Sequence, residues 1–457
     1  MSNTPSKYQA AIYDWIKQNK GRVLTVEAVA GSGKSTTLLG ALKEIVGQGR
    51  GVFLAFNKKI VLEFEEKTKA AKVDFPIRTF NGLGYKFLRA DKRWDGARAG
   101  EEGDRKYFWV AKDYFEAVLR AEGGIPQIAA KLAARAAKAV DLVMNTLHDL
   151  EAGQEAFERL CLRYEIDPTV VVINANGKQY ARSVTTQDMA LIMEAGLSDQ
   201  RRMTFAEQIY LPATGKAGRV EEFAWVLVDE AQDLNPARLR LVERMIGKQG
   251  RAIFVGDSFQ AIYGFTGADT RSMATIRTRL KADTLPLSIC YRCPPNHIEL
   301  VKRWPNPLGA KIEAVPGRAD GLLEWESGTG ALFFEDEGGK QKTKLAAGDL
   351  VICRKNAPLV GLFLQLIRAK VPARIEGRGL AEQYADLAED VLSACEAPEW
   401  REAVANVELL PCLDEWQRQK LDALEKRFGR ESWIYEEESK RLGDEVEVLA
   451  ALWDFHA

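Results

Sequence analysis

One short stretch, residues 27–37, constrains the fold of this chain more than any other. It reads Glu-Ala-Val-Ala-Gly-Ser-Gly-Lys-Ser-Thr-Thr, follows an apolar β-type run at residues 23–26, and opens a helical pattern that extends to Ile45. Glycines let successive backbone N–H groups converge on phosphate oxygens, and a helix N-terminus adds a favourable dipole. The order of strand, glycine-rich turn and helix therefore predicts a P-loop.

The side chains of this stretch suit a bound nucleotide with Mg²⁺. Lys34 is placed to reach the β- and γ-phosphates, and the hydroxyl of Ser35 suits the metal. Ala28 stands where the first glycine of the pattern is usual, so the interpretation depends on the strand–turn–helix context. The alternative, a turn that merely caps an ordinary helix, is disfavoured by the order Gly-Lys-Ser-Thr. The candidate phosphate-binding residues are Ala30, Gly31, Ser32, Gly33, Lys34, Ser35 and Thr36.

Two further apolar strands are expected to end in acidic residues. Residues 223–228 precede Asp229 and Glu230, and residues 252–256 precede Asp257. Beside a P-loop, such an aspartate holds Mg²⁺ and the glutamate can accept a proton from the attacking water. A single pair of acids after a strand is compatible with an ordinary surface. Two such strand ends together with a P-loop predict a site for ATP and Mg²⁺.

The remaining pattern places this site in an α/β protein. A helix is expected at residues 7–19, and strands at residues 51–56 and 75–79 are each followed by a helical pattern. Buried strands that alternate with helices are typical of parallel sheets. From residue 91 to 203 the alternation gives way to helical periodicity, which predicts an inserted helical subdomain.

Composition limits the partners and the compartment. The 457 residues include 64 Lys and Arg against 65 Asp and Glu, so nucleic acid would have to bind to local basic and aromatic surface. No signal-like N-terminus or membrane-length apolar run is present, which predicts a cytoplasmic protein without a membrane partner. The close pair Cys290 and Cys293 lacks the second pair that a structural zinc site requires, so both are interpreted as core thiols.

Four motifs in order resemble those of the UvrD/Rep-like superfamily 1 DNA helicases, including the F-box DNA helicase branch. They are A-G-S-G-K-S-T (30–36), V-L-V-D-E-A-Q-D (226–233), V-G-D-S-F-Q-A-I-Y-G-F-T-G-A (255–268) and Y-R-C-P (291–294). Each motif is moderately specific, whereas the ordered set with a helical insertion is very specific. The resemblance implies an ATP-dependent helicase or translocase that moves 3′ to 5′, built from two RecA-like parallel-sheet domains with helical insertions.

The resemblance also implies a role for each residue of the nucleotide site. Gln9 would read the adenine edge, while Tyr291 would stack on the base. Gln260 would sense the γ-phosphate and link it to DNA, and Arg292 would act as an arginine finger. The remaining roles fall on Lys34 and Ser35 for phosphate and Mg²⁺, Asp229 for the metal, and Glu230 for activation of water.

A path for single-stranded DNA is implied by the same resemblance. Aromatic rings stack on any base and contribute roughly 1–3 kcal/mol per base. Phe53 and Phe254, inside apolar strands, are expected in the core, whereas Tyr263 and Phe265, next to glycines in a loop, are expected to be exposed. The residues that match the path are Phe56, Asn57, Thr79, Phe80, Tyr263 and Phe265.

The chain also departs from the family pattern. Asn81 stands where a histidine is usual, and Thr266 where an arginine is common. In the second domain a strand and turn are expected at residues 349–357 and a helix at residues 358–369. The family's last two motifs are not found, so the second domain is predicted to be incomplete. The expected domain ranges are 1–90 and 204–284 for the first RecA-like domain, 91–203 for its insertion, 285–380 for part of the second, and 381–457 for part of its helical insertion.

Two other function classes follow from these observations. A nucleotide-gated single-stranded-DNA-binding protein, or a split subunit completed by a separate polypeptide that supplies the missing motifs, would carry the same residues without unwinding DNA alone. A small-molecule P-loop kinase is disfavoured, because a long insertion separates Lys34 from Asp229 and the stretch at residues 255–268 would have no role.

Overall fold

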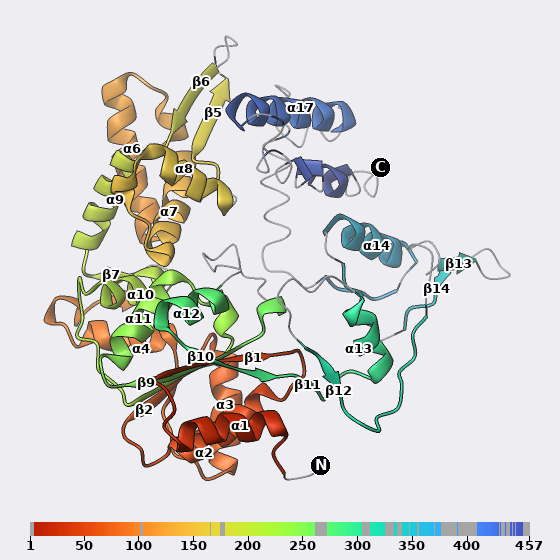
Figure 1. Ribbon diagram of the computed structural model, residues 1–457. Coiled ribbons are helices and arrows are strands. Elements are labelled where there is room, and N and C mark those ends of the chain that lie inside the picture. Colours follow the sequence, from red (N-terminus) through yellow and green to blue (C-terminus); the bar gives the residue numbers. More distant parts are fainter. Residues whose placement is uncertain are drawn as a thin grey trace. The chain divides into compact units, whose positions relative to one another are not determined.

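The computed structural model divides into two compact units, Met1–Leu322 and Leu323–Ala457, which we describe separately (Figure 1). It describes residues 4–100, 103, 105–164, 166–173, 179–260, 272–303, 311–324, 333–335, 341–346, 348–353, 356–369, 371–375, 391, 409–428, 430, 435, 439–440, 442–443 and 445–450. None of the helices within these ranges is long and apolar enough to cross a membrane.

A six-stranded parallel sheet forms the centre of the first unit (Figure 1). Its order is β10-β1-β9-β8-β2-β3, and every neighbouring pair is parallel. The central strands are buried along nearly their whole length, as expected for a sheet covered on both faces. This confirms the predicted α/β fold class. The strands are β1 (Val23–Ala28), β2 (Gly51–Ala55), β3 (Ile77–Thr79), β8 (Trp225–Val228), β9 (Arg251–Gly256) and β10 (Asp283–Leu287).

Helices cover both faces of this sheet because successive strand side chains point to opposite sides. Leu24, Phe53 and Ile253 pack with α1, α2 and α3 on one face, which lies below the sheet in Figure 1. Val52 and Phe254 pack with α4, α10, α11 and α12 on the other face. The helices are α1 (Lys7–Lys17), α2 (Lys34–Ile45), α3 (Lys58–Ala70), α4 (Phe80–Arg89), α10 (Phe205–Thr214), α11 (Pro236–Ile246) and α12 (Ser272–Leu280). Phe53 and Phe254 are fully buried, as predicted.

The edge strand β10 extends the first sheet beyond the expected boundary. Leu285 was expected to begin the second domain, yet residues 283–287 pair with β1 in register Leu24 to Asp283 through Ala28 to Leu287. Pro286 is tolerated there because an edge strand leaves one side without ladder hydrogen bonds. The chain continues in the first unit through β11 (Ile289–Cys290), α13 (Pro295–Lys302) and β12 (Glu313–Ala314), and β11 and β12 are parallel partners.

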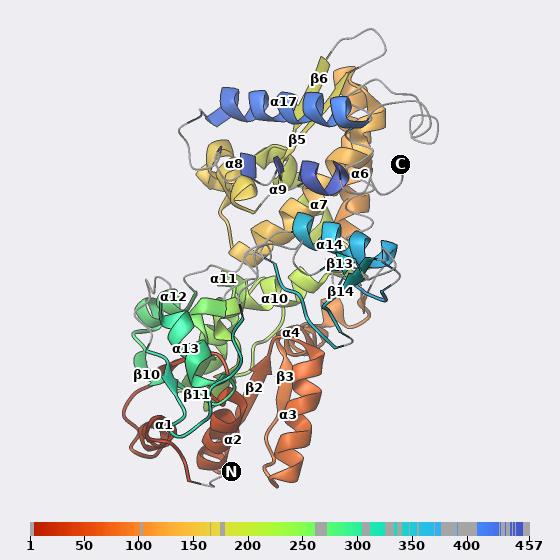
Figure 2. The ribbon, with the colours of Figure 1, turned by 90° about the vertical axis from the view of Figure 1, so that its right-hand side faces the viewer.

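Between α4 and α10 the chain forms a mainly helical region with its own apolar core. The long helices α6 and α7 pack along each other in both views (Figure 1, Figure 2). The short parallel pair β4 and β7 joins the two ends of this region. Its elements are β4 (Arg98–Ala99), α6 (Lys106–Glu122), α7 (Ala129–Thr146), α8 (Gln154–Arg163), β5 (Thr169–Ile173), β6 (Gln179–Ser183), α9 (Thr186–Ser198) and β7 (Arg202–Met203). The 3-10 helices of the unit are η1 (Lys92–Trp94), η2 (Pro126–Ile128), η3 (Leu150–Ala152), η4 (Ala231–Asp233) and η5 (Ser258–Gln260).

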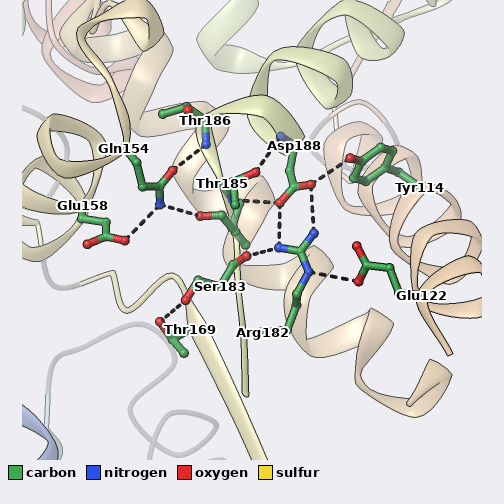
Figure 3. A network of polar contacts seen from close by, with 11 residues as sticks. Tyr114, Glu122, Gln154, Glu158, Thr169, Arg182, Ser183, Thr185, Thr186 and Asp188 are labelled. Carbon is green, nitrogen blue, oxygen red and sulfur yellow. Dashed lines mark hydrogen bonds and ion pairs between the residues drawn. The ribbon is translucent and has the colours of Figure 1, made fainter. Parts of the chain in front are cut away.

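The antiparallel pair β5 and β6 was not expected from the helical periodicity of this region. A partly buried ion pair stabilises it (Figure 3): the Arg182 guanidinium lies 3.1 and 3.2 Å from the two carboxylate oxygens of Asp188. Tyr114 of α6 donates to the same carboxylate at 2.8 Å, and Asp188 also accepts from the backbone N–H of Thr185 at the start of α9. One carboxylate therefore joins β6, α6 and α9.

Among its described residues, the second unit includes the helices α14 (Asn356–Arg368) and α17 (Leu409–Phe428) and the antiparallel pair β13 (Phe333–Glu335) and β14 (Gln341–Thr343). Helix α14 was predicted at residues 358–369. The strand expected from residue 349 does not form over residues 349–353, where Leu350 and Ile352 are 81% and 82% exposed. An apolar run becomes a strand only where a neighbour accepts its ladder hydrogen bonds, and the structure describes no such neighbour for this run.

Candidate nucleotide-binding site

The P-loop connects β1 to α2 through two glycines in the left-handed region. Gly31 has φ +69° and Gly33 has φ +81°, conformations that side-chain-bearing residues rarely adopt. Gly33 is the N-cap of α2, and its carbonyl accepts a hydrogen bond from the hydroxyl of Thr37 at 3.0 Å. The backbone N–H groups at the start of α2 are therefore presented at a helix N-terminus, where anions bind favourably.

Lys34 is directed at the acidic end of the neighbouring strand β8. Its Nζ lies 2.6 Å from Oε2 of Glu230, and the Gln232 side-chain amide donates to the same oxygen at 2.9 Å. Glu230 has φ 49°, a left-handed backbone held by its N–H donating to Asp229 Oδ1 at 3.0 Å. Non-glycine residues in this region store strain and cluster at functional sites.

The carboxyl groups beside Lys34 are desolvated. Burial, followed by the charge of Glu230, raises the pKa of Asp229 to about 6, and the same two causes raise the pKa of Asp233 to about 6. A nearby cation stabilises the charged form of such a desolvated carboxylate. Among the described residues, no three or more His, Cys, Asp or Glu side chains are arranged so that they could hold a metal ion by themselves. Mg²⁺ commonly uses one or two carboxylates with substrate phosphates and water, so Asp229 and the hydroxyl of Ser35 fit that ion.

Asp257 connects the ends of β8 and β9. Its backbone N–H donates to the side-chain oxygen of Gln232 at 3.0 Å, and its carboxylate accepts from Gln260 Nε2 at 2.7 Å. Gln232 in turn donates to Glu230, so the hydrogen bonds run from Glu230 to Gln260. Gln232 was not singled out from the sequence. Its signal was its place in the motif at residues 226–233, two residues after Glu230.

The segment at residues 291–292 packs on the P-loop from outside the main sheet. The N–H of Tyr291 donates to the carbonyl of Gly31 at 2.8 Å. A Cβ atom on Gly31 would lie 2.5 Å from Cβ of Arg292, so only glycine permits this approach. The Tyr291 side chain is 45% exposed, which leaves ring surface for stacking.

Gln9 also lies at the P-loop. Its Nε2 donates to the hydroxyl of Thr37 at 3.1 Å, and its Oε1 accepts from the Ser6 N–H at 2.9 Å in the capping box of α1. A Cβ atom on Gly33 would lie 4.0 Å from Gln9 Nε2 and 3.9 Å from Cδ2 of Tyr291. The two residues that the resemblance assigns to the base therefore flank the same glycine.

Replacing Gly31 by alanine tests the contact between the P-loop and Arg292. We expect nucleotide affinity to fall at least about tenfold, because the new methyl group meets both a positive φ and the Arg292 side chain. Fluorescent-nucleotide titration measures the effect. Gly47→Ala is the matched control, since Gly47 also has a positive φ but has open space around its Cβ position. Equal affinity of Gly31→Ala and the parent protein would show that this close approach is not needed.

The residues assigned to DNA have different surroundings. Phe56, after β2, is partly exposed. Asn57 and Thr79 are N-caps: Asn57 Oδ1 accepts from the Ile60 N–H at 2.9 Å, and Thr79 Oγ1 accepts from the Gly82 N–H at 3.0 Å.

Phe80 was expected to line the DNA path, but its side chain is buried. It is 1% exposed in the core formed with α11, because α4 starts with this side chain facing the sheet, so no base can reach its ring in this structure. Tyr263, Phe265 and Thr266 lie outside the described residues.

A P-loop between a parallel strand and a helix, faced by acidic residues at the ends of two neighbouring strands, defines a P-loop nucleotide-binding protein of the α/β class. Comparison with known families gives a more specific assignment. The model of the UvrD/REP helicase N-terminal domain matches residues 13–281, more than half of the chain. The chain belongs to this family.

Individual relatives are similar over shorter stretches. DNA helicase II of Haemophilus influenzae is 29% identical over 175 residues, which are 34% of this chain and 23% of the relative. F-box DNA helicase protein 1 of Schizosaccharomyces pombe is 24% identical over 261 residues, 55% of this chain and 27% of the relative. The RecBCD enzyme subunit RecB of Mycobacterium tuberculosis is 45% identical over 62 residues, 14% of this chain and 5% of the relative. The chain thus spans about a quarter or less of these relatives.

Proposed function

We propose that this chain binds ATP with Mg²⁺ and single-stranded DNA, and that it hydrolyses ATP to translocate along the strand as a DNA helicase motor. The direction implied by the family resemblance is 3′ to 5′. The observation that carries the proposal is the 2.6 Å ion pair between the P-loop Lys34 and Glu230. It brings a phosphate-binding cation and a candidate general base together at one edge of the sheet, which a merely structural P-loop would not require.

The proposed roles follow from the positions of the side chains. Lys34 and the N-terminus of α2 bind the phosphates, while Ser35 and Asp229 hold Mg²⁺, which would neutralise charge on the transferred phosphoryl group. When Lys34 turns to a phosphate, Glu230 loses its cation and becomes available to orient and deprotonate water. Gln260 and Arg292 are proposed as the γ-phosphate sensor and the arginine finger, and Gln9 and Tyr291 as the adenine contacts.

The proposed DNA path runs along the carboxyl ends of β2 and β3. Phe56 and Asn57 follow β2, and Thr79 ends β3, its parallel neighbour. The carboxyl ends of parallel strands are where such sheets place ligand-contacting loops. Tyr263 and Phe265 remain proposed members of the path by resemblance, and Phe80 is left out because it is buried.

The test is the rate of ATP hydrolysis with and without oligothymidylate. We expect single-stranded DNA to raise the rate several-fold and blunt duplex DNA to leave it nearly unchanged, because stacking on unpaired bases is the proposed contact. A rate that is independent of DNA, with oligothymidylate still bound, would instead support a nucleotide-gated DNA-binding protein. Absence of both ATP and DNA binding would overturn the proposal.

A further inference from the structure

Arg238 lies near the site, and the proposed roles do not explain its surroundings. It lies in the first turn of α11, and its backbone N–H donates to the N-cap side chain of Asn235 at 2.9 Å. Its Nε and Nη1 atoms are buried, and the structure describes no hydrogen-bond partner for either atom. A cation at a helix N-terminus is disfavoured by the helix dipole.

Two aromatic rings lie close to the guanidinium. Its Cζ lies 4.3 Å from the centroid of the Phe56 ring and 5.8 Å from that of Phe80. Burial lowers the pKa of Arg238 to about 10, and the charge of Asp233 opposes that shift, so the side chain stays protonated at neutral pH. A desolvated cation over an aromatic face is strongly attracted to it.

Asp233 is the acidic residue whose charge acts on Arg238. Its Oδ1 is buried and, like the two Arg238 atoms, has no hydrogen-bond partner in the described structure. Its Oδ2 accepts from Gln232 Nε2 at 3.4 Å, and the same Nε2 donates to Glu230 at 2.9 Å. Hydrogen bonds therefore join Asp233 to Glu230 through Gln232. The charge of Asp233 acts on Arg238, and the Arg238 guanidinium lies over the Phe56 ring.

We propose that Arg238 is a positioning residue that holds the Phe56 ring in place for stacking on a base. The inference rests on the proposed function, since it requires Phe56 to contact single-stranded DNA. Arg238 acts through the ring and touches neither nucleotide nor DNA. Its removal should weaken DNA binding, raise the DNA concentration needed for half-maximal ATPase stimulation, and leave the KM for ATP unchanged.

The experiment is a double-mutant cycle in the full 457-residue chain. The four proteins are the parent, Arg238→Met, Phe56→Leu and the double variant, and the probe is fluorescein-labelled oligothymidylate followed by anisotropy. Stacking is worth roughly 1–3 kcal/mol per base, so we expect Phe56→Leu to weaken binding about tenfold and Arg238→Met by a similar factor. The double variant should bind no more weakly than Phe56→Leu, because residues that act through one contact are not additive.

Arg240→Met is the matched control. Arg240 lies on the same helix, is exposed and pairs with Glu243 at 3.0 Å, so the same substitution there should leave DNA affinity unchanged. Arg238→Lys keeps a cation over the ring and should retain most of the affinity. If Arg238→Met fails to fold, judged by thermal unfolding, Arg238→Lys takes its place in the cycle, and its smaller loss must vanish in the Phe56→Leu background.

The outcomes separate this inference from the proposed function. Parent-like DNA affinity of the folded Arg238→Met protein, or a loss that adds to that of Phe56→Leu, overturns the positioning role while DNA binding stands. Unchanged affinity of Phe56→Leu also overturns it, because the ring is then outside the path. If the parent protein does not bind oligothymidylate, the proposed function fails, and the inference fails with it.

Discussion

Replacing Glu230 by glutamine is expected to lower ATP turnover by about 10²–10⁴-fold while nucleotide affinity stays nearly unchanged. A positioned general base contributes to the transition state, whereas binding depends on the P-loop and Lys34. Glutamine has the length of glutamate and can still accept from Gln232 through its oxygen. The substitution therefore removes the base and leaves the left-handed backbone at position 230 with a side chain of the same shape.

Single-turnover hydrolysis and fluorescent-nucleotide titration separate the two quantities. Glu63→Gln is the matched control, because Glu63 lies on the exposed face of α3 and pairs only with Lys67 at 2.6 Å among the ion pairs described. Hydrolysis by Glu230→Gln at the parent rate would remove Glu230 from the role of base. A large loss of affinity would instead make it a binding residue, whose ion pair with Lys34 organises the P-loop.

The centre of the fold could be predicted because its signals are local. The P-loop, α2 and the strands before Asp229 and Asp257 each carry a run of apolar residues with a glycine or an acid at a fixed position. A parallel sheet places all their carboxyl ends at one edge, so the candidate site followed from short stretches. Asp229, Glu230 and Lys34 needed no knowledge of distant contacts beyond this rule.

Elements that depend on a distant partner could not be predicted in the same way. Residues 283–287 belong to the first sheet only because β1 lies beside them, and residues 349–353 have strand composition without a described neighbour. Phe80 sits at the expected strand end, but the direction of its side chain is set by α4 packing on the sheet. The antiparallel pair β5 and β6 was not predicted, because the sequence around it has mainly helical periodicity.

The polar contacts around the site were the least predictable part. Gln232 and Asp233 belong to the motif at residues 226–233, but the motif assigned them no contact, and Arg238 lies outside it. The arrangement of the first two depends on the turn that η4 makes after Glu230. The buried atoms of Asp233 and Arg238 without hydrogen-bond partners are visible only in three dimensions. The sequence therefore predicts which groups meet the nucleotide better than which groups hold them.

A fully buried ion pair should dominate the stability of the helical region. Lys106 of α6 and Glu207 of α10 are both fully buried, with Nζ and Oε1 2.7 Å apart. Lys106 also donates to the carbonyl of Arg202 at 3.1 Å, and Tyr107 donates to Glu207 at 2.8 Å. Burial lowers the pKa of Lys106 and raises that of Glu207, and the mutual attraction of the charges opposes both shifts.

Lys106→Met is expected to destabilise this region by about 3–5 kcal/mol at pH 8, because it leaves Glu207 buried without a countercharge. The defect should shrink as the pH falls: without Lys106 the folded-state pKa of Glu207 rises further above its unfolded value, so the folded form takes up a proton that the unfolded form does not. Hydrogen exchange of α6 and α10 at pH 8 and pH 5.5, corrected for intrinsic rates, measures this local stability.

Lys112→Met on the same helix is the control. The ion pair between Lys112 and Glu116 is partly exposed, with a separation of 3.8 Å, so this substitution should cost less than about 1 kcal/mol. Equal protection of α6 and α10 in the two variants would show that the Lys106–Glu207 pair contributes no more than a surface pair. A defect in Lys106→Met that is independent of pH would show that Glu207 is not the group left uncompensated.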